Sequence, residues 1–277
     1  MAISFLTGGF TVPGPGGDVE AWLIGSGENA PLFVVTQESW SPSAGGGSLG
    51  DMTLTASYVY PAYPFWTPNY GATTPLVSVT ATADYYSVLD VEGRGDGGYL
   101  VVVNHEASGS PSDFSVRFVS TTGSTDATFS LSATVDHRYF STGAVRLDNG
   151  NFLVSYTDVT VGPLGIVDAD VYGQVLDQNG AAVGSAYLLN GNTTDVNGGG
   201  RLVALGSGYV QSYSRLAPSG GDLTPLELRA RLLDADGQPT GADVLISTVS
   251  GASDLDTEIV SLATGGFIVF WREKSAD

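Results

Sequence analysis

The stretch Val145-Arg-Leu-Asp-Asn-Gly-Asn-Phe-Leu-Val-Ser-Tyr156 recurs along the chain, as Leu202-Val-Ala-Leu-Gly-Ser-Gly-Tyr-Val-Gln-Ser-Tyr213 and as Ile259-Val-Ser-Leu-Ala-Thr-Gly-Gly-Phe-Ile-Val-Phe-Trp271. A weaker copy is Gly97-Gly-Tyr-Leu-Val-Val-Val103. Each copy has the pattern of a strand, a glycine turn and a second strand. Because self-similarity at a fixed period is typical of repeat architectures, this motif predicts a fold built from repeated units.

A second hairpin motif follows the first one at a constant distance. It appears as Val175-Leu-Asp-Gln-Asn-Gly-Ala-Ala-Val-Gly184 and as Leu232-Leu-Asp-Ala-Asp-Gly-Gln-Pro-Thr-Gly241, each with an Asp-x-x-Gly turn. The two turn aspartates are 57 residues apart, and so are Leu205 and Leu262 of the first motif. Two hairpins in one period make a four-stranded unit, which is typical of a β-propeller blade.

The sequence therefore predicts an all-β fold, a single β-propeller domain over residues 1–277 with five four-stranded blades. The predicted blades are residues 18–82, 83–134, 135–190, 191–248, and 249–277 completed by residues 1–13. Pairing of the N-terminus with the C-terminus would close the ring and remove an exposed sheet edge. The alternative is two β-sandwiches in which hairpins merely recur.

The repeat also resembles a known group of proteins. Leu-x-x-Gly-Gly-Phe-x-Val-x-Trp at 262–271 and Asp-Val-Tyr-Gly-Gln-Val-Leu-Asp-Gln-Asn-Gly-Ala-Ala-Val-Gly at 170–184 are similar to tandem repeats of large bacterial surface proteins of the haemolysin and adhesin type. The resemblance covers 135–277 well, 83–134 faintly and 1–82 not in detail. It implies an extracellular scaffold for adhesion. The Gly-Gly-x-Gly-x-Asp calcium repeats of such proteins are missing from this sequence.

Composition restricts the classes of partner. The formal net charge is −19, which would repel nucleic acid and anionic lipid surfaces, so we expect no nucleic-acid partner. The same charge suits a divalent cation, a saline environment or a neutral glycan, or simply keeps the protein soluble. The absence of cysteine excludes disulfides, thiol catalysis and Cys-ligated zinc.

The N-terminal residues Met1-Ala-Ile-Ser-Phe-Leu-Thr-Gly-Gly9 lack the basic segment and the long apolar segment of a secretory signal peptide. No apolar run in the sequence is long enough to span a membrane as a helix. We expect no membrane insertion, and a location outside the cell or on a virion surface, reached without an N-terminal signal peptide.

A set of aspartates stands just before the first strand of each predicted blade: Asp18, Asp84, Asp136, Asp195 and Asp254. The first strand of a blade lines the channel of a propeller, so these carboxylates are candidate ligands of a channel Ca²⁺ ion, which prefers six to eight oxygen ligands. In the alternative interpretation, each aspartate caps its own turn and the five side chains do not converge.

Alternating carboxylates provide a second candidate. Asp254-Leu-Asp-Thr-Glu258 and the pair Asp168 and Asp170 place carboxylates on one face of an extended chain. Such groups could chelate a cation or supply the acid and base of a glycosidase. The polar outer face of a strand produces the same alternation.

An aromatic stretch, Tyr58-Val-Tyr-Pro-Ala-Tyr-Pro-Phe-Trp-Thr-Pro-Asn-Tyr70, has no counterpart in the other repeats. Exposed aromatic faces stack on sugars or dock on protein surfaces. The candidate ligand-binding residues are Tyr58, Tyr60, Tyr63, Phe65, Trp66 and Tyr70. Alternatively, the stretch folds back to cover the core of its blade.

The chain has two histidines, His105 and His137. His105 follows a predicted strand and could be a ligand or an acid, but an exposed histidine at a strand end is the simpler interpretation. Arg94-Gly-Asp96 spells a cell-attachment tripeptide that also arises by chance in a glycine-rich turn.

We interpret these patterns as a non-enzymatic extracellular recognition or adhesion module that binds a glycan or a protein partner. A first alternative is a virion spike or fibre component. A second is a carbohydrate-active hydrolase or lyase with channel carboxylates.

The calcium hypothesis makes a direct prediction. If a channel ion is part of the native structure, added Ca²⁺ should raise the midpoint of thermal unfolding and a chelator should lower it, because a ligand of the native state stabilises that state. Differential scanning calorimetry with either addition measures this. A midpoint that neither addition moves would contradict the hypothesis.

Overall fold

The computed structural model describes the backbone of residues 11–14, 17–27, 30–41, 51–62, 67–79, 85–106, 112–163, 165–219, 222–249, 252–262 and 265–275. It describes the side chains of residues 86–105, 112–163, 165–216, 226–249, 257–262 and 265–272. These residues form strands and turns, and they include no helix that is long and apolar enough to cross a membrane. The prediction of an all-β fold is confirmed.

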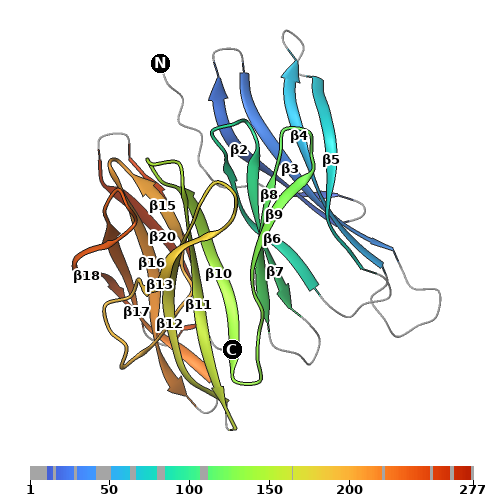
Figure 1. Cartoon of the computed structure of the whole chain (residues 1–277). Coiled ribbons are helices and arrows are strands. Elements are labelled where there is room, and N and C mark those ends of the chain that lie inside the picture. The colour runs from blue at the N-terminus through green and yellow to red at the C-terminus, as the bar shows by residue number, and fades with distance from the viewer. Residues whose placement is uncertain are drawn as a thin grey trace. The chain divides into compact units, whose positions relative to one another are not determined.

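The strands form antiparallel sheets in which chain neighbours are also sheet neighbours. Figure 1 shows them coloured along the chain. The first sheet contains β1 (Thr11–Gly14), β2 (Gly17–Gly27), β3 (Ala30–Ser41), β4 (Asp51–Ala62) and β5 (Thr67–Val79). The second contains β6 (Tyr85–Gly93), β7 (Tyr99–Glu106), β8 (Asp113–Val119) and β9 (Thr125–Leu131).

Three further sheets follow. One contains β10 (His137–Arg146), β11 (Phe152–Gly162), β12 (Gly165–Leu176) and β13 (Ala182–Leu188). The next contains β14 (Val196–Gly198), β15 (Leu202–Leu205), β16 (Gly208–Ser219), β17 (Asp222–Leu233) and β18 (Pro239–Thr248). The last is the hairpin of β19 (Ala252–Ser261) and β20 (Phe267–Ser275).

The chain divides into two compact units, residues 1–110 with 115–129 and residues 111–114 with 130–277. Each sheet begins and ends close to a predicted blade boundary. Residues 11–14 pair with β2, so the described residues do not show the predicted pairing of the N-terminus with the C-terminal hairpin. The assignment of the whole chain to one domain stays a prediction.

The turns have the chemistry that the repeat predicts. Asp177 Oδ1 accepts hydrogen bonds from the backbone N–H groups of Asn179 (2.8 Å) and Ala181 (2.9 Å). In the next repeat, Asp234 Oδ1 accepts from the N–H groups of Asp236 (3.0 Å) and Gln238 (2.8 Å). An aspartate that caps the backbone of its own turn in this way fixes the length of the hairpin.

The core of the second unit lies between successive sheets. One cluster joins Leu153 and Val171 of the β10–β13 sheet to Tyr213 and Leu233 of the β14–β18 sheet, and all four are buried. Another joins Val210 and Ala230 to Ile259 of β19. The β14–β18 sheet is therefore buried against neighbours on both faces, as expected of stacked repeats.

The first strand of the β14–β18 sheet is interrupted, since β14 and β15 both pair with β16. Between them, the N–H of Arg201 donates to Ser212 Oγ and the N–H of Ser212 donates to the carbonyl of Arg201, both at 2.9 Å. Gly199 and Gly200 have φ values of 67° and 102°. A Cβ atom at Gly200 would overlap the backbone carbonyl of Ser212, whereas one at Gly199 would meet no atom within 4 Å.

This contrast yields a matched pair of variants. Gly199→Ala should cost about 1 kcal/mol of unfolding free energy, the strain of a left-handed alanine. Gly200→Ala should cost about 3 kcal/mol, because an overlap with backbone is added to that strain. Urea unfolding followed by circular dichroism measures both values. Equal costs would contradict the close approach of Gly200 to β16.

Candidate active site

A histidine and an aspartate form a hydrogen-bonded pair at one end of the β10–β13 sheet. His137 is the first residue of β10, and its Nδ1 lies 2.8 Å from Asp158 Oδ1 of β11. The side chains are 40% and 23% exposed, so both remain accessible. Because Nδ1 is engaged by the carboxylate, Nε2 is the ring nitrogen left for proton exchange with a ligand.

Two carboxylates lie directly opposite each other on the neighbouring strands. Asp158 of β11 pairs in register with Asp170 of β12, and Thr160 pairs with Asp168. Directly opposed residues of an antiparallel pair have Cβ atoms about 4.5 to 5.5 Å apart and side chains on the same face. The predicted placement of Asp168 and Asp170 on one strand face is thus confirmed, and Asp158 joins them.

Asp170 has an environment different from that of Asp158. It is 7% exposed, and its Oδ1 accepts hydrogen bonds from the side-chain amides of Asn190 (2.8 Å) and Asn197 (3.3 Å). Burial raises the pKa of Asp170, the two amide hydrogen bonds oppose that rise, and the negative charges of Asp168 and Asp158 add to it. Asp170 therefore holds its proton to higher pH than an ordinary aspartate.

Tyrosines line the sheet beside the carboxylates. The ring centroids of Tyr139 and Tyr156 are 6.1 Å apart, and those of Tyr156 and Tyr172 are 5.9 Å apart. Burial, with a smaller contribution from Asp158, raises the pKa of Tyr139 and Tyr156, so both remain neutral phenols. Tyr139 and Tyr172 are half-buried and offer polarisable ring surface next to the acids.

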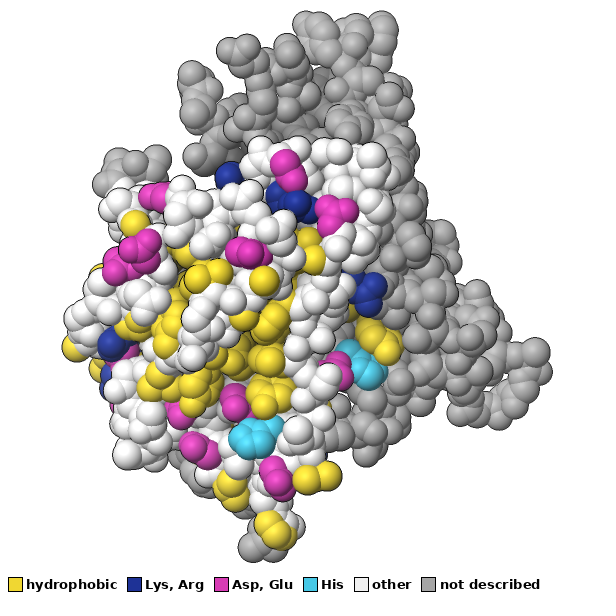
Figure 2. Space-filling model, viewed as in Figure 1, with side chains coloured by type: hydrophobic (Ala, Val, Ile, Leu, Met, Phe, Trp, Pro, Cys, Tyr) yellow, Lys and Arg dark blue, Asp and Glu magenta, His cyan; other side chains and the backbone are white. Residues whose placement is uncertain are grey.

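The surface view places acidic groups beside apolar surface. Figure 2 shows hydrophobic side chains gathered in a strip on one face, with acidic side chains at its borders. At the candidate site itself, Tyr139 lies opposite Asp158 in the sheet register and Asp158 lies opposite Asp170. Aromatic surface next to hydrogen-bonding carboxylates is the composition of many sugar-binding sites, because one face of a sugar ring is apolar and its edge is hydroxylated.

The aspartates predicted to bind calcium have local partners where they are described. Asp195 Oδ2 accepts hydrogen bonds from Asn192 (2.8 Å) and Arg215 (3.2 Å). Asp136 is exposed next to His137. The side chains of Asp18, Asp84 and Asp254 lie outside the described residues. Within the described part of the chain, no group of three or more His, Asp or Glu side chains is arranged to hold a metal ion. The Ca²⁺ site stays a prediction.

The aromatic stretch 58–70 spans a hairpin. Tyr58 and Tyr60 belong to β4 and Tyr70 to β5, and Tyr60 pairs in register with Asn69. The side chains of Tyr58, Tyr60 and Tyr70, together with Tyr63, Phe65 and Trp66, lie outside the described residues. Their predicted role in ligand binding is not tested.

The other candidates have local partners. Asp254 and Asp256 pair in register with Lys274 and Arg272, and Glu258 forms a 3.6 Å ion pair with Arg201. In the tripeptide 94–96, Arg94 forms an ion pair with Asp96 at 2.8 Å. The ring of His105 stacks on Tyr86 with a centroid distance of 4.2 Å. The ion pairs of Glu258 and Arg94 and the stacking of His105 give these three residues structural roles, whereas the side chains of Asp254 and Asp256 lie outside the described residues.

The sequence interpretation missed Asp158 and the tyrosines as members of one site. The signal was present as alternation on three successive strands: His137 and Tyr139, Tyr156 and Asp158, then Asp168, Asp170 and Tyr172. Alternation in three strands that pair with one another predicts a shared face.

Comparison with known proteins gives a fold-level likeness. No protein-family model matches the chain, and no curated protein sequence matches it significantly. The structure of the polysaccharide lyase Uly1 matches with a TM-score of 0.50 and 8% identity, over 94% of this chain and 56% of that one. This chain therefore spans a little over half the length of that lyase.

Two further structures are similar at lower scores. A polysaccharide lyase that is an ulvan lyase has a TM-score of 0.46 and 10% identity, over 96% of this chain and 79% of its own. An arabinanase of Bacillus subtilis has a TM-score of 0.43 and 11% identity, over 90% of this chain and 92% of its own. At these identities the likeness shows the fold alone.

The comparisons correct our leading functional interpretation. The similar structures are those of enzymes that act on carbohydrates, whereas we expected a non-enzymatic adhesion module or a virion component. The second alternative, a carbohydrate-active hydrolase or lyase, is therefore the one that we carry into a proposal.

The raised pKa of Asp170 predicts a pH dependence of stability. Since the folded state retains this proton above the pKa of an unfolded aspartate, about 3.9, the native protein should lose stability as the pH rises past that value. Asp170→Asn removes this contribution. Urea unfolding should therefore show the native protein more stable, relative to the variant, at about pH 4 than at about pH 7.

The control for this measurement is Asp136→Asn, which removes an exposed carboxylate from the same end of the sheet. It accounts for the loss of one carboxylate from this end of the sheet. An Asp170→Asn difference that did not change between the two pH values would contradict the effect of burial on Asp170.

Proposed function

We propose that this chain is a carbohydrate-active enzyme that hydrolyses glycosidic bonds in a neutral polysaccharide, with Asp158 and Asp170 as its carboxylate pair. The observation that carries the proposal is their direct opposition on β11 and β12 in different environments. Two carboxyl groups whose surroundings push their proton affinities apart are the requirement for glycoside hydrolysis. The likeness to carbohydrate-active enzymes supports this class.

The two carboxyl groups take different roles. Asp170, whose pKa is raised, donates its proton to the glycosidic oxygen as the bond between that oxygen and the anomeric carbon breaks. Its Oδ1 is held by Asn190 and Asn197, which leaves Oδ2 for the substrate. Asp158, whose Oδ1 lies 2.8 Å from His137 Nδ1, attacks the anomeric carbon. Water then displaces the sugar from Asp158 and returns a proton to Asp170.

The separation of the pair favours this retaining form of the reaction. Opposed residues on paired strands have Cβ atoms about 4.5 to 5.5 Å apart, which allows their carboxyl groups to adopt the short spacing of retaining enzymes, about 5 to 5.5 Å between carboxyl groups. An inverting enzyme would need roughly 6.5 to 9.5 Å to admit a water molecule.

The negative charge of the site and of the whole chain favours a neutral substrate. The site face carries Asp158, Asp168 and Asp170, and the whole chain has a formal charge of −19. A polyuronate or a sulfated glycan would be repelled from such a surface. A neutral glycan has no such penalty, and it can stack on Tyr139 and Tyr172.

A second candidate reaction is β-elimination. It is favoured by the exposure of His137, by the Asp158 carboxylate on its Nδ1, and by the likeness to the polysaccharide lyase. In that reaction His137 Nε2 would remove a proton next to a uronate carboxylate and the C–H electrons would form a double bond. The glycosidic C–O bond would break, and the departing oxygen would take a proton from water.

We further propose that the five sheets are the blades of one β-propeller. The boundaries of the sheets along the chain support this arrangement, and so does the likeness to the lyase over 94% of the chain. Blades that share a central axis would place the ends of their first strands, such as the His137 end of β10, around one opening.

Incubation with neutral polysaccharides (arabinan, xylan, β-glucan) and with polyuronates tests the function. Hydrolysis should produce new reducing ends without ultraviolet absorbance from unsaturated sugars, and only from neutral glycans. Asp158→Asn and Asp170→Asn should each lower the rate roughly 10²- to 10⁴-fold, because each removes a proton-transfer or nucleophilic group.

The matched control is Asp136→Asn, an exposed aspartate next to His137, which should keep the native rate. Unsaturated ends that disappear in His137→Gln would replace hydrolysis with elimination. Full activity in both Asp158→Asn and Asp170→Asn, or no new ends from any polysaccharide, would contradict the proposed function.

A further inference from the structure

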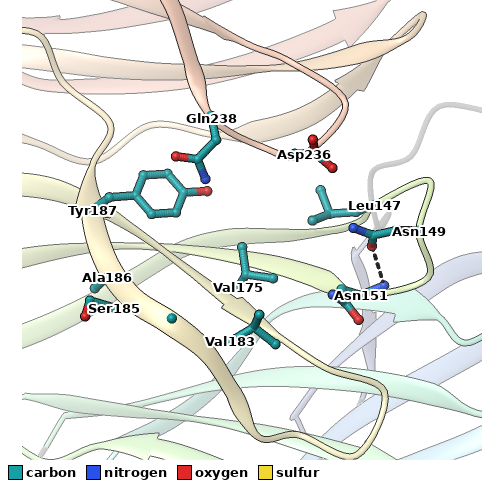
Figure 3. Close-up of a pocket in the computed structure, with 11 residues that line it drawn as sticks. Leu147, Asn149, Asn151, Val175, Val183, Ser185, Ala186, Tyr187, Asp236 and Gln238 are labelled. Carbon is teal, nitrogen blue, oxygen red and sulfur yellow. Dashed lines mark hydrogen bonds between the residues drawn. The ribbon is translucent and has the colours of Figure 1, made fainter.

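A polar pocket lies at the end of the β10–β13 sheet opposite to the carboxylate pair. Its volume is about 490 Å³, and Figure 3 shows the residues around it. The β10–β11 turn contributes Asn149 and Asn151, and the β17–β18 turn contributes Asp236 and Gln238. Leu147, directly after β10, forms part of the wall. Strands β12 and β13 supply the rest of it, which consists of Val175, Val183, Gly184, Ser185, Ala186 and Tyr187.

The lining chemistry is that of a neutral, hydroxylated ligand. Asn149, Asn151, Ser185 and Gln238 are uncharged polar groups, Asp236 is the acid, and the lining includes neither Lys nor Arg. Within the described part of the chain, the side-chain amides of Asn151 and Gln238 make no hydrogen bond, so both are available as donors and acceptors. An anionic ligand would find no countercharge there.

Tyr187 closes one side of the pocket with its ring. Its hydroxyl donates a 2.8 Å hydrogen bond to the carbonyl of Gly237, which fixes the ring against the β17–β18 turn. Burial raises its pKa, so the phenol stays neutral. In Figure 3 the ring lies beside the Gln238 amide, while Val175 and Val183 present methyl groups to the same space. A fixed ring beside free amides suits one sugar ring stacked and hydrogen-bonded at its edge.

The repeat itself shows that this lining is not a by-product of hairpin geometry. At the 57-residue period, Asn149 and Asn151 correspond to Gly206 and Gly208, and Tyr187 corresponds to Val244. The next repeat keeps the hairpins but has none of these three polar side chains. The backbone of the hairpins therefore does not require these three polar side chains.

The pocket is separate from the carboxylate pair. Asn151 immediately precedes β11, and Asp158 lies seven residues further along the chain. At about 3.3 Å per strand residue, the two sites are roughly 20 Å apart along the sheet. A ligand in the pocket would leave the carboxylates free.

We infer that this pocket is a secondary binding site for a neutral saccharide, held by the amides of Asn151 and Gln238 and by the ring of Tyr187. It binds the glycan without cleaving it, since Asp236 is the single carboxylate in its lining. The inference stands on the pocket alone and does not depend on the proposed hydrolysis.

The test uses ¹⁵N-labelled protein titrated with neutral hexasaccharides prepared from arabinan, xylan and β-glucan, and with oligogalacturonate as the anionic comparison. The NMR signals of the Asn151 and Gln238 side-chain amides should shift with at least one neutral hexasaccharide and not with oligogalacturonate. Asn151→Ala together with Gln238→Ala should weaken that binding about tenfold, because two hydrogen bonds are lost.

Two further variants separate the sites. Asn179→Ala, in the neighbouring β12–β13 turn and outside the pocket lining, should bind like the native protein. Asp158→Asn should also bind at the pocket, whatever the outcome of the activity assay. Unshifted pocket amides with all three hexasaccharides, or equal binding in the Asn151→Ala/Gln238→Ala double variant, would overturn the inference.

Discussion

Burial of each sheet against the next one is the constraint on which the second unit depends. A four-stranded sheet cannot bury two apolar faces by itself, so it must be covered by its neighbours in the chain. Strand β16 lies in such a position, and Val210–Ser214 are buried as an unbroken run. The polar members of that run are satisfied only in part: Gln211 Nε2 donates to the carbonyl of Ser212 at 2.7 Å, whereas Gln211 Oε1 is buried without a hydrogen-bond partner among the described residues.

The same constraint places the polar side chains that could bind a ligand near the ends of the strands. Where both faces of a sheet are covered, polar side chains can reach a ligand only near the turns. At one end of the β10–β13 sheet, the β11–β12 hairpin brings Asp158 next to Asp170. At the other end, the β10–β11 and β17–β18 turns bring Asn151 near Gln238. One sheet thereby carries two separate polar sites.

The repeat predicted the strands, the Asp-x-x-Gly turns and the shared face of Asp168 and Asp170, because these depend on local chemistry and alternation. It did not predict the His137–Asp158 pair, since a register shift between Ser141 and Gly143 places His137 on the face opposite Val145. Uninterrupted alternation, counted back from the buried Val145, would place His137 on the same face as Val145. The partners of Asp170, Asn190 and Asn197, follow β13 and required the tertiary structure.

The side chains that surround the acids explain how like charges persist side by side. Two opposed carboxylates destabilise each other unless donors or protons compensate. Here Asn190 and Asn197 donate to Asp170, burial keeps its proton, and His137 holds Asp158. The compensating groups are side chains of the protein itself, so the carboxyl pair needs no bound cation to be stable. A neutral molecule can bind there without disturbing this balance, and that electrostatic property is the physical basis for proposing a neutral glycan as the substrate.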